Sequence, residues 1–238
     1  MEPSSSLILT KLRPPANRSR TIWRDRLLRK LTPEPNVDLA LVCAPAGYGK
    51  TTLLVDWTRQ LYQAGIKVSW YSLDGSDNHP INFGTYLVAS LEQALGPGSG
   101  LAPVQQLLRA STDTDLLTLL PTVINSLCAT DGQIALVLDD YHLIRAPEIH
   151  QAVNFLISHR PDNFHIAIGS RSNPALPLAR WRACGRLVEL RTSDLRFVDQ
   201  ETKLFLMDSM QLDLPDELIA RLAEQVEGWP AGLQLAAL

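Results

Sequence analysis

A glycine-rich turn between a predicted strand and a predicted helix constrains the fold of this chain more than any other feature. Residues 39–43 are uniformly apolar and predict a buried strand, whereas residues 52–57 predict the start of a helix. The run Gly47-Tyr48-Gly49-Lys50-Thr51 lies between them. Backbone N–H groups in such a turn point toward bound anions, so the run predicts a loop that holds the phosphates of a nucleotide, ATP or ADP.

Each residue type in this loop suits that task. Gly47 and Gly49 let the backbone approach phosphate oxygens without a β-carbon in the way. Lys50 would reach the β- and γ-phosphates, and the Thr51 hydroxyl would complete the shell of a Mg²⁺ ion. Ala44 stands where the usual pattern has its first glycine, and a left-handed backbone there would cost about 1 kcal/mol. The loop residues expected to contact the nucleotide are Ala46, Gly47, Tyr48, Gly49, Lys50, Thr51 and Thr52.

Two carboxylates follow a second apolar run. Residues 134–142 begin with a stretch too short for a buried helix and continue with Asp139 and Asp140. A parallel strand would deliver these acids to its carboxyl edge, where ligands bind in open α/β sheets. We expect Asp139 to hold Mg²⁺, directly or through water, and Asp140 to orient or deprotonate an attacking water. Alternatively, the pair merely ends a strand and caps the segment after it. The candidate catalytic residues are thus Lys50, Asp139 and Asp140, and the candidate metal ligands are Thr51 and Asp139.

The charge balance gives no sign of nucleic-acid binding, since the net charge is −3 over 238 residues. Basic residues do cluster early, but they are spaced along a predicted helix with leucines on its other face, which favours a solvated surface over a DNA-binding arm. This cluster comprises Lys11, Arg13, Arg18, Arg20, Arg24, Arg26, Arg29 and Lys30. With 45% apolar residues, the chain can bury one large core and leave a smaller lobe.

Cysteine and histidine positions follow no metal or disulfide pattern. Cys43, Cys128 and Cys184 share no ligand or redox spacing, so we expect ordinary reduced cysteines. His142 and His150 stand apart from cysteine partners, so no zinc site is expected. The sequence has neither a signal peptide nor an apolar run of membrane length, which favours a cytoplasmic protein without a membrane partner.

Predicted strands and helices alternate along most of the chain. Besides the run that ends in the carboxylate pair, strands are predicted at residues 39–43, 67–74, 164–169 and 187–190. Helices are predicted at residues 83–95, 104–110, 114–129 and 148–158, and again at 199–210 and 215–226. Such alternation predicts an α/β fold whose parallel sheet is covered by helices on both faces. Together with the glycine loop it predicts a P-loop NTPase. The last two helices predict a small C-terminal lid over the nucleotide.

Several motifs together resemble one family. They are Lys11-Leu12-Arg13-Pro14-Pro15, Ile22-Trp23-Arg24 with Leu27-Leu28, the loop from Pro45 to Thr52, Trp70-Tyr71-Ser72-Leu73-Asp74 with Asp77-Asn78, Leu138-Asp139-Asp140-Tyr141-His142, and Gly228-Trp229-Pro230-Ala231-Gly232-Leu233. The set spans nearly the whole chain. It resembles the nucleotide-binding module of MalT-like regulators, which are LuxR-type transcription activators of the STAND class of signalling ATPases, with an AAA/NB-ARC-like fold.

The resemblance implies further site residues. In such modules the segment before the loop packs on adenine, which would place Ile22, Trp23 and Arg24 there, partly through backbone contacts. Pro230 would cover the base from the lid, and Arg171 would distinguish ATP from ADP by contacting the γ-phosphate. The alternatives are a surface ion pair for Arg171 and a packing role for Trp23. For the aspartates at positions 74 and 77, helix capping is the simpler explanation.

The same resemblance implies three parts: an N-terminal segment contributing to the adenine pocket (1–35), a P-loop core (36–191) and the helical lid (192–238). Residues 228–238 begin like a helix, with Pro230 near its first turn, and stop on an apolar stripe, so a fragment of a longer protein is expected. Family members place a winged-helix arm, a helical-repeat sensor and a helix-turn-helix DNA-binding domain after this module. DNA binding is therefore expected of the parent protein and not of this chain.

The activity that the resemblance implies is that of a switch. The ADP form would be closed and monomeric, whereas ATP with an inducer would open the protein and promote self-association, and slow hydrolysis would reset it. A P-loop kinase or other ATP-dependent transferase is the alternative, and it would need an acceptor pocket. A GTPase should contain Asn-Lys-x-Asp and Asp-x-x-Gly, and neither occurs. A dinucleotide-binding oxidoreductase is disfavoured because Thr52 replaces the third glycine of its fingerprint.

Overall fold

A five-stranded sheet forms the centre of the computed structural model, which describes residues 7–16, 21–34, 36–110 and 115–237. The strands are β1 (Leu39–Cys43), β2 (Lys67–Ser72), β3 (Ile134–Asp139), β4 (Phe164–Ser170) and β5 (Leu187–Leu190). Their order across the sheet is β2-β3-β4-β1-β5, and every neighbouring pair is parallel. β1 and β3 are buried at every residue, which explains their unbroken apolar runs.

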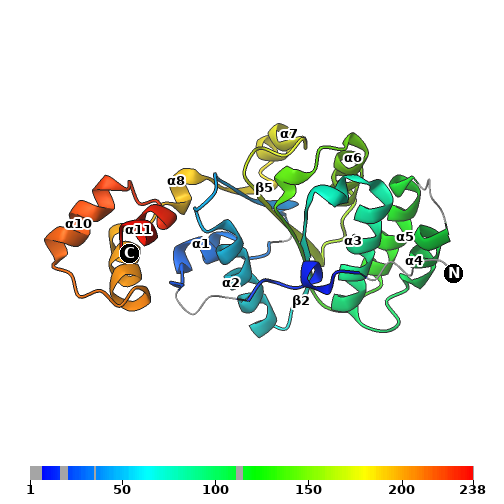
Figure 1. The fold of residues 1–238 in the computed structure, drawn as a ribbon. Coiled ribbons are helices and arrows are strands. Elements are labelled where there is room, and N and C mark those ends of the chain that lie inside the picture. Colours follow the sequence, from blue (N-terminus) through cyan, green and yellow to red (C-terminus); the bar gives the residue numbers. More distant parts are fainter. Residues whose placement is uncertain (1–6, 17–20, 35, 111–114, 238) are drawn as a thin grey trace.

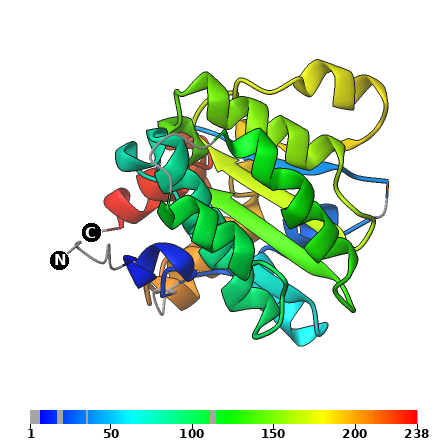
Figure 2. The same cartoon turned by 90° about the vertical axis from the view of Figure 1, so that its right-hand side faces the viewer.

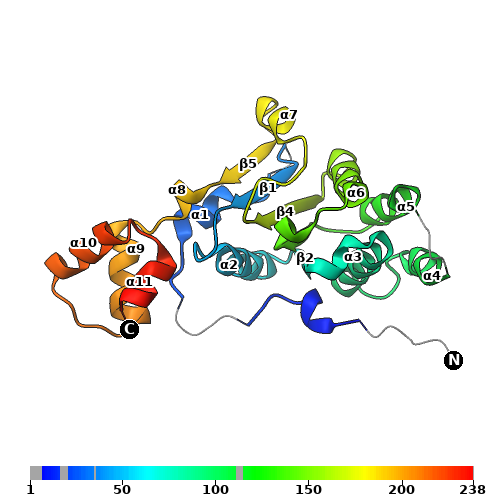
Figure 3. The same ribbon diagram turned by 45° about the horizontal axis from the view of Figure 1, so that its top comes forward.

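Helices cover both faces of the sheet (Figure 1, Figure 3). On one face α1 (Asp25–Lys30) and α2 (Lys50–Gln63) pack against alternate residues of β1, Ala40 and Val42. On the other face, whose core includes Leu39 and Leu41, lie α3 (Pro80–Leu95), α4 (Ala102–Ala110), α5 (Leu116–Cys128), α6 (Pro147–Ser158) and α7 (Leu178–Ala183). Figure 2 shows α3 to α6, in teal and green, in front of the strands. The predicted α/β architecture is confirmed.

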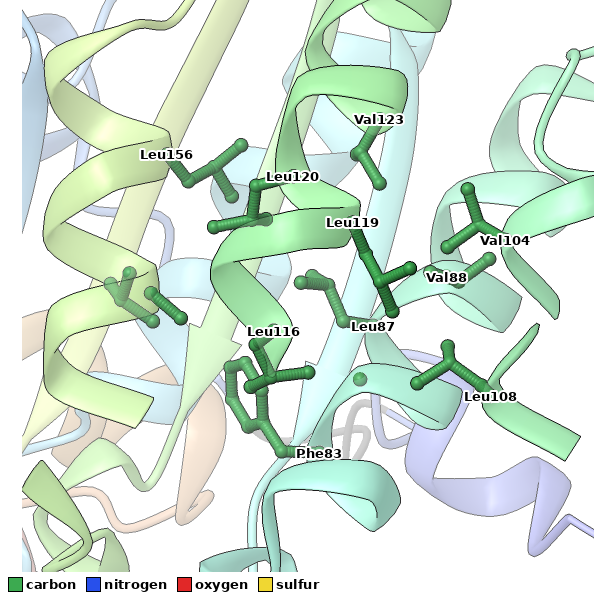
Figure 4. A pocket seen from close by; sticks show the side chains of 13 residues that line it. Phe83, Leu87, Val88, Val104, Leu108, Leu116, Leu119, Leu120, Val123 and Leu156 are labelled. Carbon is green, nitrogen blue, oxygen red and sulfur yellow. The ribbon is translucent and has the colours of Figure 1, made fainter. Parts of the chain in front are cut away.

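A small apolar cavity lies between the helices of this second face (Figure 4). Its volume is about 20 Å³, and side chains from α3, α4, α5 and α6 surround it, including Phe83, Leu108, Leu119 and Leu156. A space of this size holds no more than a water molecule or two, and the carbon-lined walls offer water no partner. The cavity is therefore a packing feature of this layer and not a nucleotide site.

The C-terminal helices form a small cluster beside the sheet (Figure 1). After the short α8 (Thr192–Leu195) come α9 (Asp199–Leu204), which continues as a π-helical turn (Phe205–Ser209), then α10 (Asp216–Gln225) and α11 (Pro230–Ala236). The apolar core of this cluster comprises Phe205, Leu206, Ile219 and Leu233, and Ile22 of the N-terminal segment packs against it. We call α9 to α11 the lid. Its helices fall close to the predicted positions.

Most predicted elements agree with the structure to within a few residues, and two differences are informative. The short helix α7 has no counterpart among the predicted helices. The strand predicted at 67–74 ends at Ser72, because Asp74 caps the 3₁₀ turn η2 (Gly75–Asn78) by accepting the Ser76 N–H, while Asp77 accepts the Asp74 N–H at 2.7 Å. The capping explanation for these aspartates is thus confirmed. Residue 114, the predicted start of one helix, lies outside the described residues.

The expectation that the early basic residues form a solvated helix face is wrong for Lys11 and Arg24. The 3₁₀ turn η1 (Leu9–Leu12) and α1 are separate short helices, and both side chains are buried. Lys11 Nζ donates to the Asp77 carboxylate at 2.6 Å and lies over the Tyr86 ring. Partners distant in sequence offset the cost of burying these charges, and local composition does not reveal such partners. Arg18 and Arg20 of the same cluster lie outside the described residues.

Three further observations concern membranes, thiols and metals. None of the helices in the described part of the chain has the length and apolar content that a bilayer crossing requires. Cys43 is buried, Cys128 and Cys184 are exposed, and all are free thiols. Within the described ranges, no group of three or more His, Cys, Asp or Glu side chains is arranged to hold a metal ion.

Candidate phosphate-binding site

The loop between β1 and α2 has the backbone that its glycines predict. Gly47 has φ of +82° and Gly49 has φ of +75°, both in the region that favours glycine. Gly49 is the N-cap of α2, so the helix begins at Lys50 with its first N–H groups facing the loop. The N-terminus of α2 therefore presents orphan donors and a partial positive charge to any anion in the loop.

Ala44 does not carry the strain considered for it. Its N–H donates to the Ser170 carbonyl at 3.2 Å, which continues the pairing between β1 and β4 by one residue. The described non-glycine residues with positive φ are Asp140, Gln211 and Glu227, so Ala44 needs no left-handed backbone. An alanine therefore replaces the first glycine of the pattern at no conformational cost.

Lys50 lies at the centre of a charged cluster. Its side chain is buried, and Nζ donates to the Pro45 carbonyl at 2.9 Å, which holds the ammonium group against the loop. Burial lowers the pKa of Lys50, the Arg171 guanidinium lowers it further, and the carboxylates of Asp140 and Asp139 oppose both effects. The structure thus brings four of the predicted side chains within electrostatic reach of one another.

Asp139 ends β3 and is 2% exposed. Burial raises its pKa to about 6, a hydrogen bond with the Thr51 side chain opposes that shift, and the charge of Asp140 adds to it. One carboxylate oxygen also accepts the Asp140 N–H at 3.0 Å. The loop threonine and the strand aspartate, predicted separately as oxygen ligands, therefore lie close enough for the threonine side chain to influence the carboxylate.

Gly169 is a site residue that sequence reasoning missed. A β-carbon on Gly169 would lie 2.5 Å from Asp139 Oδ1 and 2.8 Å from Leu54 Cδ1, so only glycine fits between β3 and α2 at this point. A glycine inside a buried strand often marks the close approach of another group. The glycine at the end of the apolar run 164–169 could therefore have indicated this contact from the sequence.

Asp140 adopts a left-handed backbone, with φ of +57°, and its side chain is partly exposed. It occupies the N-cap position of the 3₁₀ turn η3 (Tyr141–Leu143) without a side-chain cap hydrogen bond, so the capping alternative has no such bond to support it. His142 Nδ1 lies 3.8 Å from Asp140 Oδ1, and burial lowers the pKa of this histidine. His142 thus joins the cluster, although the sequence offered no role for it.

Arg171 follows β4, which lies between β1 and β3 in the sheet. Its side chain is exposed and makes no ion pair with any described residue, so the surface ion pair considered for it is not observed. Its charge acts on Lys50 and on His142. The guanidinium therefore lies near the loop, just after β4, and β4 is flanked by β1 and β3.

Two of the predicted adenine residues, Ile22 and Arg24, contact the lid. Ile22 packs against the lid core, and Arg24 donates to the Glu201 carboxylate at 3.0 Å and to the Arg196 carbonyl at 2.9 Å. Any contact of Arg24 with a nucleotide would therefore come from its backbone. Trp23 is 49% exposed, which argues against the core-packing alternative, whereas packing of this side chain on the lid stays a prediction.

The lid reaches the loop through α11, where Pro230 occupies the first helical position as predicted. The Ala231 N–H donates to the Gly47 carbonyl at 3.1 Å, and the Tyr48 and Trp229 ring centroids are 6.5 Å apart. The site thus combines the carboxyl edge of the sheet with the first turn of α11. Lys50, Thr51, Asp139, Asp140 and Arg171 meet at that edge, whereas Ile22 and Arg24 make their contacts with the lid.

The chain is similar in sequence to a part of known transcriptional regulators. No protein-family model matches the chain. Among curated proteins, it is 39% identical over 232 residues to the HTH-type transcriptional regulator MalT of Yersinia enterocolitica and 38% identical to that of Cronobacter sakazakii. Both matches cover 98% of this chain and 25% of the relative, so the chain spans about a quarter of the length of these regulators.

Among solved structures, a Walker-type ATPase of Pyrococcus abyssi aligns with a TM-score of 0.56 and 19% identity, over 95% of this chain and 69% of that one. The Orc1 protein of Aeropyrum pernix, solved in complex with DNA, aligns with a TM-score of 0.52 and 17% identity, over 90% and 57%. At such identities the likeness establishes the fold alone. Over nearly its whole length the chain is thus similar to a part of the MalT transcriptional regulators, and its fold is that of the P-loop ATPases.

Proposed function

We propose that this chain binds ATP and ADP and works as the switch module of a larger transcriptional activator. The observation that carries the proposal is the convergence of the Lys50 ammonium, the neighbouring Thr51 and Asp139 side chains and the Arg171 guanidinium at one edge of the sheet. Glycines with positive φ lie beside them, so loop N–H groups can approach an anion closely. A nucleoside phosphate supplies the negative charge that this arrangement of donors suits.

The proposal gives each group a role. Lys50 binds the β- and γ-phosphates, residues 46–52 bind phosphate oxygens through the backbone, and Arg171 contacts the γ-phosphate and so separates ATP from ADP. Asp140 orients or deprotonates the water that attacks the γ-phosphate, in a slow hydrolysis. The adenine base is held by Ile22, Trp23, Arg24 and Pro230.

A magnesium ion fits this site. The Thr51 hydroxyl and the Asp139 carboxylate are neighbouring oxygen groups, and the raised pKa of Asp139 marks a buried carboxylate that a nearby cation would stabilise. Because no larger acidic or histidine cluster lies among the described residues, phosphate oxygens and water would supply the remaining ligands, as Mg²⁺ prefers. When bound, the ion would neutralise part of the phosphate charge.

The proposed switch uses the difference between ATP and ADP. ADP favours a closed resting state, and ATP favours opening and self-association, because a ligand shifts an equilibrium only by its differential affinity for the two states. The proposed parts are the N-terminal segment (1–35), the core (36–191) and the helical lid (192–238). DNA contact is assigned to a helix-turn-helix domain of the parent protein, in the cytoplasm, and neither nucleic acid nor membrane is a proposed partner of this chain.

Calorimetry tests the proposal. ADP, ATP and NAD are titrated with Mg²⁺ into nucleotide-free wild-type protein and into Lys50→Ala. We expect wild-type protein to bind ADP and ATP but not NAD, and Lys50→Ala to lose affinity for both by at least about a hundredfold, since a buried charge-assisted contact is removed. Wild-type affinity for ADP in Lys50→Ala would contradict the assignment. An acceptor molecule that becomes phosphorylated would instead favour a transferase.

A further inference from the structure

The first turn of α11 is bonded to the phosphate loop. The first N–H groups of a helix have no partner within the helix, and Pro230, at the first position, has no N–H to donate. Ala231 therefore supplies the first free donor, and its acceptor at 3.1 Å is the Gly47 carbonyl. The backbone N–H of Ala231 in the lid thus has its hydrogen-bond acceptor in the phosphate loop.

Trp229 fills the space beside this bond. A β-carbon on Gly47 would lie 2.7 Å from Trp229 Nε1, and a β-carbon on Gly232 would lie 2.6 Å from Trp229 Cε3. The Tyr48 ring is the indole's aromatic neighbour on the loop side. The indole therefore sits between a loop glycine and a lid glycine, and a side chain at either position would displace it.

The bond to Ala231 has a consequence for the next residue of the loop. In a trans peptide the C=O of one residue and the N–H of the following residue point in opposite directions. A fixed Gly47 carbonyl therefore directs the Tyr48 N–H to the side of the loop away from α11. That N–H is one of the loop donors assigned above to the phosphates.

We propose that Trp229 and Ala231 form a latch through which the docked lid holds the Gly47–Tyr48 peptide in the orientation that binds phosphate. The latch rests on the proposed nucleotide binding and adds to it a positioning residue, Trp229, which acts on the loop backbone and not on the nucleotide. When the lid moves away, this peptide is free to turn and the loop loses a donor. Lid position and nucleotide release are therefore coupled.

Variants within α11 and its N-cap separate the latch from the rest of the lid. Trp229→Ala removes the indole, and Trp229→Phe keeps an aromatic ring. Gly232→Ala adds a methyl group against Trp229 from the lid side, touches no loop residue and raises helix propensity. Gln234→Ala, on the exposed side of the same helix, is the matched control.

Two readouts are needed. The first is hydrogen–deuterium exchange of the loop amides at residues 46–49 in nucleotide-free protein. The second is the release rate of a fluorescent ADP analogue chased with excess ADP. We expect Trp229→Ala and Gly232→Ala to accelerate both, with release faster by about tenfold, Trp229→Phe to be intermediate and Gln234→Ala to match wild type.

The outcomes separate the latch from the proposed function. Unchanged loop exchange and unchanged release in Trp229→Ala and Gly232→Ala overturn the latch, as does equal acceleration by Gln234→Ala. Failure of wild-type protein to bind the ADP analogue overturns the proposed function. In that case the exchange of the nucleotide-free loop still decides whether the lid holds it.

Discussion

The ionised form of Asp139 is the one that the proposed function needs, but ionisation of this buried carboxylate lowers the stability of the fold. The carboxylate is nearly inaccessible, and its pKa is raised to about 6 by burial, despite the hydrogen bond from Thr51. The pKa in the unfolded chain is about 3.9, so the folded state binds this proton more tightly than the unfolded state. As the pH rises from 4 through 6, ionisation of the buried group therefore lowers the free energy of unfolding.

Asp139→Asn should raise the free energy of unfolding of the nucleotide-free protein at pH 7.5, because the amide carries no charge to bury. The pKa shift of about two units corresponds to a gain of up to about 3 kcal/mol. The gain should shrink as the pH falls toward 4, where the wild-type carboxyl is protonated in the fold. Urea unfolding at several pH values measures it, with Asp162→Asn, at an exposed position outside the cluster, as the control. If the difference in free energy of unfolding between Asp139→Asn and wild type did not change with pH, this account of Asp139 would be contradicted.

Arg171→Ala should weaken ATP binding by at least about tenfold and ADP binding much less, because the proposed partner of the guanidinium is the γ-phosphate. The matched control is Arg180→Ala, an exposed arginine of α7. Calorimetric titration of both nucleotides provides the comparison. Equal losses for ATP and ADP would remove the sensor role of Arg171.

At the scale of the element, the predictable features are those with a local pattern. β1, the loop and α2 are predictable because an apolar run, two glycines and Lys50 follow one another directly, and Asp139 is predictable because it ends an apolar run. Neither pattern contains the partner of a buried charge. Arg24 pairs with a glutamate in the lid, and Lys11 with Asp77, so the prediction of a solvated face fails for both. The packing of the Trp229 indole against Gly47 is likewise a tertiary contact, and no local sequence pattern indicates it.

The junction of the N-terminal segment and α9 should depend on Glu201. This buried carboxylate accepts hydrogen bonds from Arg24 at 3.0 Å and from Arg26 at 2.9 Å, so Glu201→Ala leaves the buried Arg24 without its charge partner. The expected cost is about 3–5 kcal/mol, seen as early loss of the lid in thermal or urea unfolding and as protease cleavage after residue 191.

The same lid contains a control for that experiment. Lys203 pairs with Asp216 at 2.7 Å, but both side chains are exposed, so Lys203→Ala should cost less than about 1 kcal/mol. If Glu201→Ala and Lys203→Ala had equal effects, the buried ion pair would not be what joins the N-terminal segment to the lid.

At the scale of the whole molecule, the lid is joined to the rest of the chain at several separate points. The Glu201 ion pairs connect it to the N-terminal segment, Ile22 of that segment packs against its apolar core, and α11 is bonded to the phosphate loop. Two of the adenine residues proposed in the N-terminal segment, Ile22 and Arg24, contact the lid, and the phosphate residues lie at the edge of the sheet. A nucleotide bound between the lid and the sheet would therefore contact both, and its affinity would depend on their relative position.

The central claim is that this chain binds adenine nucleotides. It is tested most directly by denaturing the purified chain and identifying any released small molecule by chromatography against ADP, ATP and NAD standards. The account predicts ADP in near-stoichiometric amount from wild-type protein and little or none from Lys50→Ala. Wild-type protein that releases no adenine nucleotide, and that takes up none when ADP and Mg²⁺ are added back, would contradict it.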